Sequence, residues 1–96
     1  MPKTVSKTLP FTWKVGGAAA NDIEVRPSNM SDVLAAEEEA SPMRPNAFNI
    51  QMACLQVVRA GTFTGPFAPA HFRQMRSVQF AVIAEAMREA DALGED

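Results

Sequence analysis

Hydrophobic and polar residues alternate between residues 4 and 15 of the chain. Leu9, Phe11 and Trp13 occupy odd positions, and mainly threonine, serine or lysine occupies the even ones. A period of two is typical of a β-strand with one buried face. Pro10 lacks the N–H that a neighbouring strand would bind, so the pattern predicts a strand at the edge of a sheet.

A second alternating segment follows a turn. Residues 16–22 begin with two glycines, which adopt positive φ without strain, and predict the turn. Ile23 and Val25 then alternate with charged residues, which predicts a short second strand. Together the two segments predict a β-hairpin over about residues 4–26. A lone hairpin is marginal in water, so we expect a helix across its apolar face.

The remainder of the chain carries the spacing of helices. The first predicted helix covers about residues 29–40, after Pro27. Ser28 or Ser31 is expected to cap it, and Asp32 in its first turn suits the positive end of the helix dipole. Its three consecutive glutamates predict a solvated face.

Three further helical segments follow. The second helix is predicted over about residues 46–60, ended by Gly61 as a C-cap. A short helical turn is predicted over about residues 69–75, with a proline near its first position. The last helix is predicted over about residues 77–93. The expected fold class is therefore α+β: an N-terminal β-hairpin packed on a small bundle of three main helices plus a short helical turn, in one domain spanning residues 1–96.

The predicted helix over residues 46–60 is apolar nearly all round. One apolar arc suffices to attach it to its own domain, and a second arc carries Phe48, Met52 and Leu55. A helix of this kind is either central in its domain or partly covered by a partner. We therefore expect Phe48, Met52 and Leu55 to leave the core and to bind a partner protein. Methionine suits such a surface because its side chain is flexible and polarisable.

The chain has six methionines, and three of them lie near the ends of predicted elements. Met30, Met43 and Met75 are therefore expected to be more exposed than methionines within the helices.

Composition excludes several classes of protein. The chain has 96 residues, of which 47% are hydrophobic, so a small globular core is expected and disorder throughout is not. Nine Lys and Arg against eleven Asp and Glu give a net charge of −2, without a basic stripe. Nucleic-acid binding is not expected, because it usually needs clustered cations. No membrane-spanning or secretory segment is predicted, and we expect a cytoplasmic protein.

Candidate catalytic chemistry is sparse. His71 is the only histidine and no nucleophile motif accompanies it, so a structural or solvent-facing role is expected. Cys54 is the only cysteine, lies on an apolar arc and cannot form an internal disulfide. No phosphate loop and no metal-ligand spacing is present, and no carboxylate pair is placed about a substrate. We therefore predict a protein without enzymatic activity, catalytic residues, cofactor or metal.

The order of elements resembles the Mu-like phage tail assembly chaperone family. The resemblance is carried by the hairpin, by residues 24–27 (Glu-Val-Arg-Pro), by residues 32–37 (Asp-Val-Leu-Ala-Ala-Glu) and by the helical remainder. The segment from Phe63 to Phe72 does not match the family pattern. The resemblance implies a chaperone in the bacterial host cytoplasm that binds the phage tape measure protein and keeps it soluble until the tail tube assembles. It implies that an apolar helix of the partner lies in a groove lined by Phe, Met and Leu.

Two alternatives stay open at the level of sequence. The first alternative is a structural tail or head–tail connector subunit of the virion. A small DNA-binding regulator is the less favoured alternative. Arg73, Arg76 and Arg88 would then contact phosphates, but their acidic neighbours would repel DNA. A self-associating face of Phe48, Met52 and Leu55 would have the same sequence pattern as a partner groove, so a homo-oligomer is also open.

Overall fold

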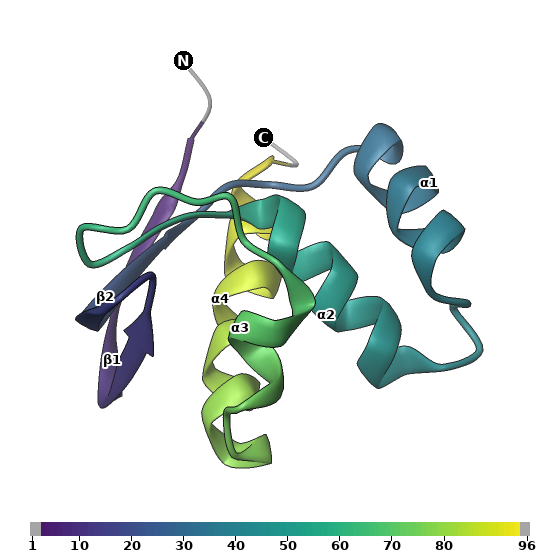
Figure 1. Cartoon of the computed structure of the whole chain (residues 1–96). Helices are drawn as coiled ribbons and strands as arrows, with labels where there is room; N and C mark the ends of the chain where they lie inside the picture. Colours follow the sequence, from purple (N-terminus) through teal and green to yellow (C-terminus); the bar gives the residue numbers. More distant parts are fainter. Residues whose placement is uncertain (1–2, 95–96) are drawn as a thin grey trace.

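The α+β fold class is confirmed, with one more strand than the sequence predicts. The computed structural model describes residues 3–94. Strands β1 (Val5–Val15), β2 (Ala18–Val25) and β3 (Val57–Ala60) form one antiparallel sheet in the order β1-β2-β3. Helices α1 (Met30–Glu39), α2 (Pro45–Gln56), α3 (Pro69–Arg73) and α4 (Ser77–Gly94) make up the remainder (Figure 1).

The second strand of the hairpin, β2, is longer than predicted. Gly16 and Gly17 alone form the turn, both with positive φ, and β2 begins at Ala18. A Cβ on Gly16 would overlap the ring of Phe63, so glycine is required there by packing as well as by conformation. Strand β1 lies at the edge of the sheet as predicted, and Pro10 falls in a bulge between Thr8 and Trp13 where regular pairing is interrupted.

The predicted helix over residues 46–60 is wrong in its last turn. Helix α2 ends at Gln56, and residues 57–60 form β3, which pairs with β2. Val57 and its neighbour Val58 are β-branched and suit a strand. Arg59 pairs with Asp22 at 3.1 Å and with Glu24 at 3.5 Å across the two strands. The open edge of β2 therefore overrides the local helical pattern, and Gly61 serves a tight turn rather than a helix cap.

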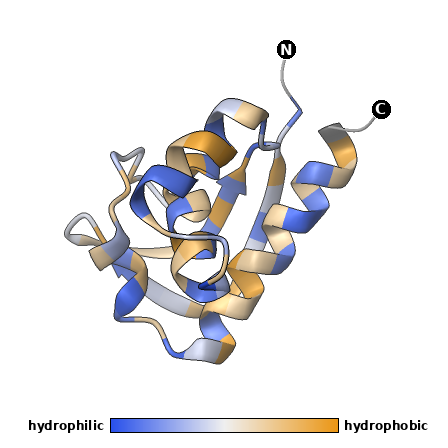
Figure 2. Cartoon of the chain, turned by 90° about the vertical axis from the view of Figure 1, so that its right-hand side faces the viewer, coloured by the Kyte–Doolittle hydropathy of each residue, from blue (hydrophilic) through white to orange (hydrophobic). Residues whose placement is uncertain are grey.

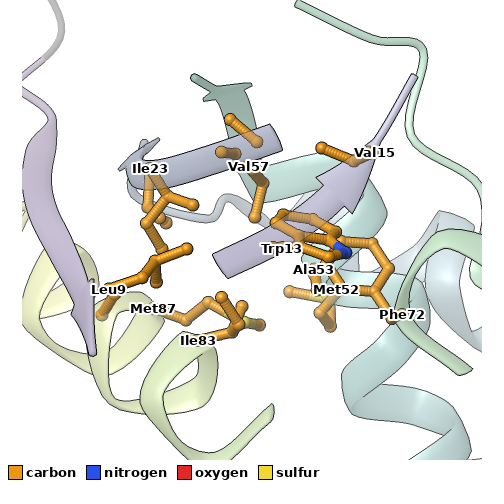
Figure 3. Close-up of a cluster of buried hydrophobic side chains, with 14 of the residues drawn as sticks. Leu9, Trp13, Val15, Ile23, Met52, Ala53, Val57, Phe72, Ile83 and Met87 are labelled. Atoms are coloured by element: carbon orange, nitrogen blue, oxygen red, sulfur yellow. The ribbon is translucent and has the colours of Figure 1, made fainter. Parts of the chain in front are cut away.

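The core lies between the sheet and the helices α2 and α4. Side chains of the strands point towards those of the two helices, and Trp13 lies against Phe72 with ring centroids 5.2 Å apart (Figure 3). Ile23, Val25 and Ile83 are fully buried. The opposite face of the sheet carries polar side chains.

The segment between Phe63 and Phe72 closes one end of this core. The backbone of Phe63 pairs with Ala60, and Phe67 stacks on Trp13 with ring centroids 6.0 Å apart. The indole N–H of Trp13 donates to the carbonyl oxygen of His71 at 3.1 Å. A stretch of sequence that does not match the pattern of the chaperone family is thus part of the aromatic core.

Helix α2 lies between α1 and α4 (Figure 1). Both outer helices pack on it, so α2 has a neighbour on each side. This arrangement positions the candidate site.

Candidate partner-binding groove

A groove runs over α2, with α1 on one side and α4 on the other. Its volume is about 440 Å³. The floor comes from α2, one wall from the start of α1 and the other wall from α4. Its lining residues are Ser28, Val33, Phe48, Asn49, Met52, Gln56, Ala84, Met87, Arg88 and Asp91.

The apolar side chains that line the groove belong to the core. Met52 and Met87 are each 7% exposed, and the half-buried side chains of Val33 and Phe48 pack against the same core. Side chains that are held in place by packing against the core form a preformed surface rather than a mobile one. The groove can therefore receive apolar side chains without first rearranging its floor.

Two of the three predicted partner-binding residues line this groove. Phe48 and Met52 do, whereas Leu55 is half-buried elsewhere on α2 and lines none of it. The expectation that all three leave the core is wrong for Met52, which is buried. The reason is that α2 is the middle helix, so its second apolar arc faces α1 and α4 instead of solvent.

A polar cluster forms one end of the groove. The Oδ1 atom of Asp91 accepts hydrogen bonds from the backbone N–H of Ser28 at 2.8 Å, from its hydroxyl at 3.0 Å and from Gln56 Nε2 at 3.2 Å. Gln56 also donates to the carbonyl oxygen of Arg26 at 3.1 Å. These bonds join the segment before α1 to α2 and α4, and so fix the width of the groove at this end.

The α1 wall is held by a second set of polar contacts. Arg26 donates two hydrogen bonds of 2.8 Å to the carboxylate of buried Asp32, one to each oxygen. These bonds hold the pKa of Asp32 below its usual value, and raise the pKa of Arg26. The cap of α1 is Asn29, which exchanges hydrogen bonds with Asp32, and not Ser28 or Ser31 as predicted. Asparagine fits because its carboxamide oxygen reaches the N–H of Asp32 at 3.0 Å.

The outer face of α1 carries apolar side chains in water. Met30 is 66% exposed and Leu34 is 55% exposed. Both lie on the same face of the helix, because they are four residues apart, and Val33 of the groove wall is next to this face. Figure 2 views the molecule from the side on which α1 lies. Met43, in the linker after α1, is exposed as expected, whereas Met75 packs on the core.

The remaining candidate residues do not form a catalytic arrangement. His71 Nδ1 accepts from the backbone N–H of Ala68 at 2.9 Å, and its ring lies edge-on to Phe63. Cys54 is half-buried, and burial raises the pKa of its thiol to about 11, so it is protonated at neutral pH. Within residues 3–94 no cluster of three His, Cys, Asp or Glu side chains could hold a metal ion.

The three arginines of the DNA-binding alternative are not brought together. Arg88 lines the groove, whereas Arg73 lies on α3 and Arg76 immediately before α4. Arg88 lies twelve positions after Arg76 in the chain, which corresponds to about 18 Å along the axis of α4.

Sequence reasoning missed the α4 wall. Ala84, Arg88 and Asp91 are spaced four and three residues apart, along the border between the apolar and polar sides of α4. The ribbon of α4 is banded orange and blue in Figure 2. Such a border stripe is the signal that could have found them, since a groove between two helices is lined by their flanks.

Comparisons with known proteins identify no relative. No family model, no curated protein and no solved structure matches the chain. In the described part of the chain, no helix has the length and apolarity needed to span a membrane.

Proposed function

We propose that this protein is a phage tail assembly chaperone that binds an apolar helix of the tape measure protein in the groove over α2. Binding keeps the partner soluble in the host cytoplasm until the tail tube assembles around it. The observation that carries the proposal is the preformed groove between two flanking helices, whose floor includes the apolar side chains of Phe48 and Met52.

The chemistry of the groove suits one face of a helix. Such recognition uses apolar side chains at spacings of three and four residues, inserted between the helices of the receptor. Methionine at two lining positions, Met52 on the floor and Met87 on the α4 wall, can adapt to partner side chains of different shape. That adaptability matters for a chaperone that meets many segments of one long partner.

The resemblance to the tail assembly chaperone family supports the same function. The residues that carry it include Arg26 and Asp32, and these two form the ion pair that holds the α1 wall of the groove. Two of the residues that carry the resemblance thus help to shape the proposed site.

Release of the partner is expected to occur by competition. The sequence has no nucleotide-binding motif, so growing tube subunits displace the chaperone from the tape measure protein. Displacement requires modest affinity at each groove, and many copies along one partner supply avidity.

Co-expression with the tape measure protein of the same phage tests the proposal. Wild-type protein should raise the soluble yield of the partner, and Phe48→Glu should lose this effect because it places a charge among the apolar side chains of the groove. Val78→Glu is the matched control: Val78 is 65% exposed and lies outside the groove, so its variant should act like wild type. An unchanged soluble yield with the wild-type protein would contradict the function.

Mass spectrometry of purified virions separates the chaperone from a structural subunit. A chaperone leaves the tape measure protein before the tail is complete, so the chain should be absent from finished particles. Its stoichiometric presence there would favour a tail or head–tail connector subunit instead.

A further inference from the structure

Several exposed charged side chains of the described residues have no ion-pair partner, and four of them lie in two pairs. Lys7, Arg26 and Arg59 have carboxylate partners within 4 Å. Among the described residues, Arg73 and Arg76 at the junction of α3 and α4 have no such partner, and neither do Glu37 and Glu38 on α1. We call Arg73 and Arg76 the basic patch and Glu37 and Glu38 the acidic patch; neither patch has an ion-pair partner among the described residues.

The basic patch borders an apolar pocket on the side of α2 away from the groove floor. The pocket lies between α2, α3 and α4 and has a volume of about 330 Å³. Ile50, Phe72, Met75 and Phe80 supply its apolar surface. Arg73 also lines it, and Arg76 stands between two of its lining residues in the chain.

The acidic patch continues the apolar outer face of α1. Glu37 and Glu38 follow Leu34 by three and four residues, so they lie on the same face as Leu34 and Met30. Glu39 points to the other side of α1 and lines a depression together with Arg73 of the same molecule. The outer face thus presents two large apolar side chains followed by two glutamates.

We propose that the outer face of α1 binds the α2–α3–α4 pocket of a second copy of this chain. Met30 and Leu34 enter the apolar pocket, and Glu37 and Glu38 lie against Arg73 and Arg76. No residue of α1 lines this pocket in its own molecule, so the contact forms between molecules.

The contact is head-to-tail, because its two surfaces differ. A heterologous contact repeats from copy to copy and produces a chain or a ring. One short helix face buries little area, so self-association in free solution is weak. Met30 and Leu34 do not line the groove over α2, which leaves every groove in the array accessible. The proposal does not depend on the proposed function, although a row of grooves would suit a long partner.

Sedimentation of the purified protein alone tests the contact. Wild-type protein should associate progressively between micromolar and millimolar concentration, and less so in ~0.5 M NaCl, where exposed charges are screened. A wild-type protein that stays monomeric over this range at low salt would overturn the proposal. The partner is not needed, so the result is independent of the co-expression test.

Charge exchange identifies the two surfaces. The variants Glu37→Arg/Glu38→Arg and Arg73→Glu/Arg76→Glu should each associate about tenfold more weakly than wild type, because like charges then face each other. Mixed in equal amounts they should associate again, since each basic helix face meets an acidic pocket. Failure of the mixture to associate, or undiminished association of either variant alone, would overturn the assignment.

A matched control excludes an effect of net charge. Glu85→Arg/Glu89→Arg changes the net charge by the same amount as the α1 variant, but on the exposed side of α4 near Lys7. This control should associate like wild type. A loss equal to that of the α1 variant would show that net charge, and not the proposed contact, governs association.

Discussion

The two sides of α2 are built in different ways. On the side of the sheet, Ile23, Val25 and Ile83 are fully buried, and aromatic rings close the end of the core. On the side of α1, the buried residues of the helix are Asp32 and Ala36, while Met30 and Leu34 face water. The sheet side uses apolar residues to hold the fold together, and the α1 side displays them.

Polar contacts replace apolar burial in holding α1. The helix is attached through the Arg26–Asp32 ion pair, the Asn29 cap, and the bonds from Ser28 to Asp91 before its first turn. Directional bonds fix the position of a helix, but they bury little apolar surface. Burial of apolar surface is the main source of stability. We therefore expect α1 to open locally more readily than the sheet and α4.

Removal of a core ring should have the largest effect. Phe72→Ala takes a buried ring from between Trp13 and Phe80 and should lower the free energy of unfolding by about 3–5 kcal/mol. A loss of this size is a large part of the stability of a small domain, so urea unfolding should show it clearly. Val78→Ala is the exposed control and should change little. A loss below about 1 kcal/mol for Phe72→Ala would contradict the closed core.

Loss of the ion pair should have the next largest effect, and a local one. Asp32→Asn leaves Arg26 without its carboxylate and should cost about 2 kcal/mol, less than a fully buried pair because the Arg26 side chain is 28% exposed. Hydrogen exchange should show faster exchange in α1 than in β2. Glu38→Gln, on the outer face of the same helix, is the control. Equal acceleration in α1 and in the sheet would remove the distinction between the two sides.

The same carboxylate should give the protein a specific acid sensitivity. Hydrogen bonds from Arg26 hold the pKa of Asp32 below its ordinary value of 3.8 in the folded protein. Its contribution to stability is therefore present above that value and is lost as the pH falls through the lower folded pKa. Urea unfolding at decreasing pH should show a shallower decline for Asp32→Asn than for wild type. Parallel curves would show that the ion pair contributes nothing to acid sensitivity.

Substitutions on the exposed apolar positions should have the smallest effect. Leu34→Ser and Met43→Ser should each change the free energy of unfolding by no more than about 0.5 kcal/mol, because neither side chain supports the fold. Thermal or urea unfolding of the dilute protein measures this. A cost above about 1 kcal/mol for Leu34→Ser would mean that the outer face of α1 is covered in the folded molecule.

Local patterns predicted most elements because local physics determines them. The alternation before Val15, the edge position implied by Pro10 and the spacing in α4 all depend on residues close together in the chain. The predicted cap of α1, Ser28 or Ser31, is wrong because serine and asparagine are both good caps, and only the geometry of Asn29 and Asp32 distinguishes the three positions.

The predictions from sequence are wrong where contacts between residues far apart in the chain determine the structure. Residues 57–60 have an apolar pattern that fits a helix or a strand, and the free edge of β2 selects the strand. Met52 lies on the predicted surface arc, but the placement of α1 and α4 on either side of α2 buries it. The groove itself is made by three helices, so its α4 wall could not be placed from any single segment.

Site-specific photocrosslinking tests the groove most directly. A photoreactive phenylalanine analogue at Asn49 lies in the groove, and the same analogue at Val78 lies at an exposed position outside it. In cells that also produce the tape measure protein, we predict a crosslink to that protein from position 49 and none from position 78. Crosslinks of equal yield from both positions, or from position 78 alone, would contradict binding in the groove.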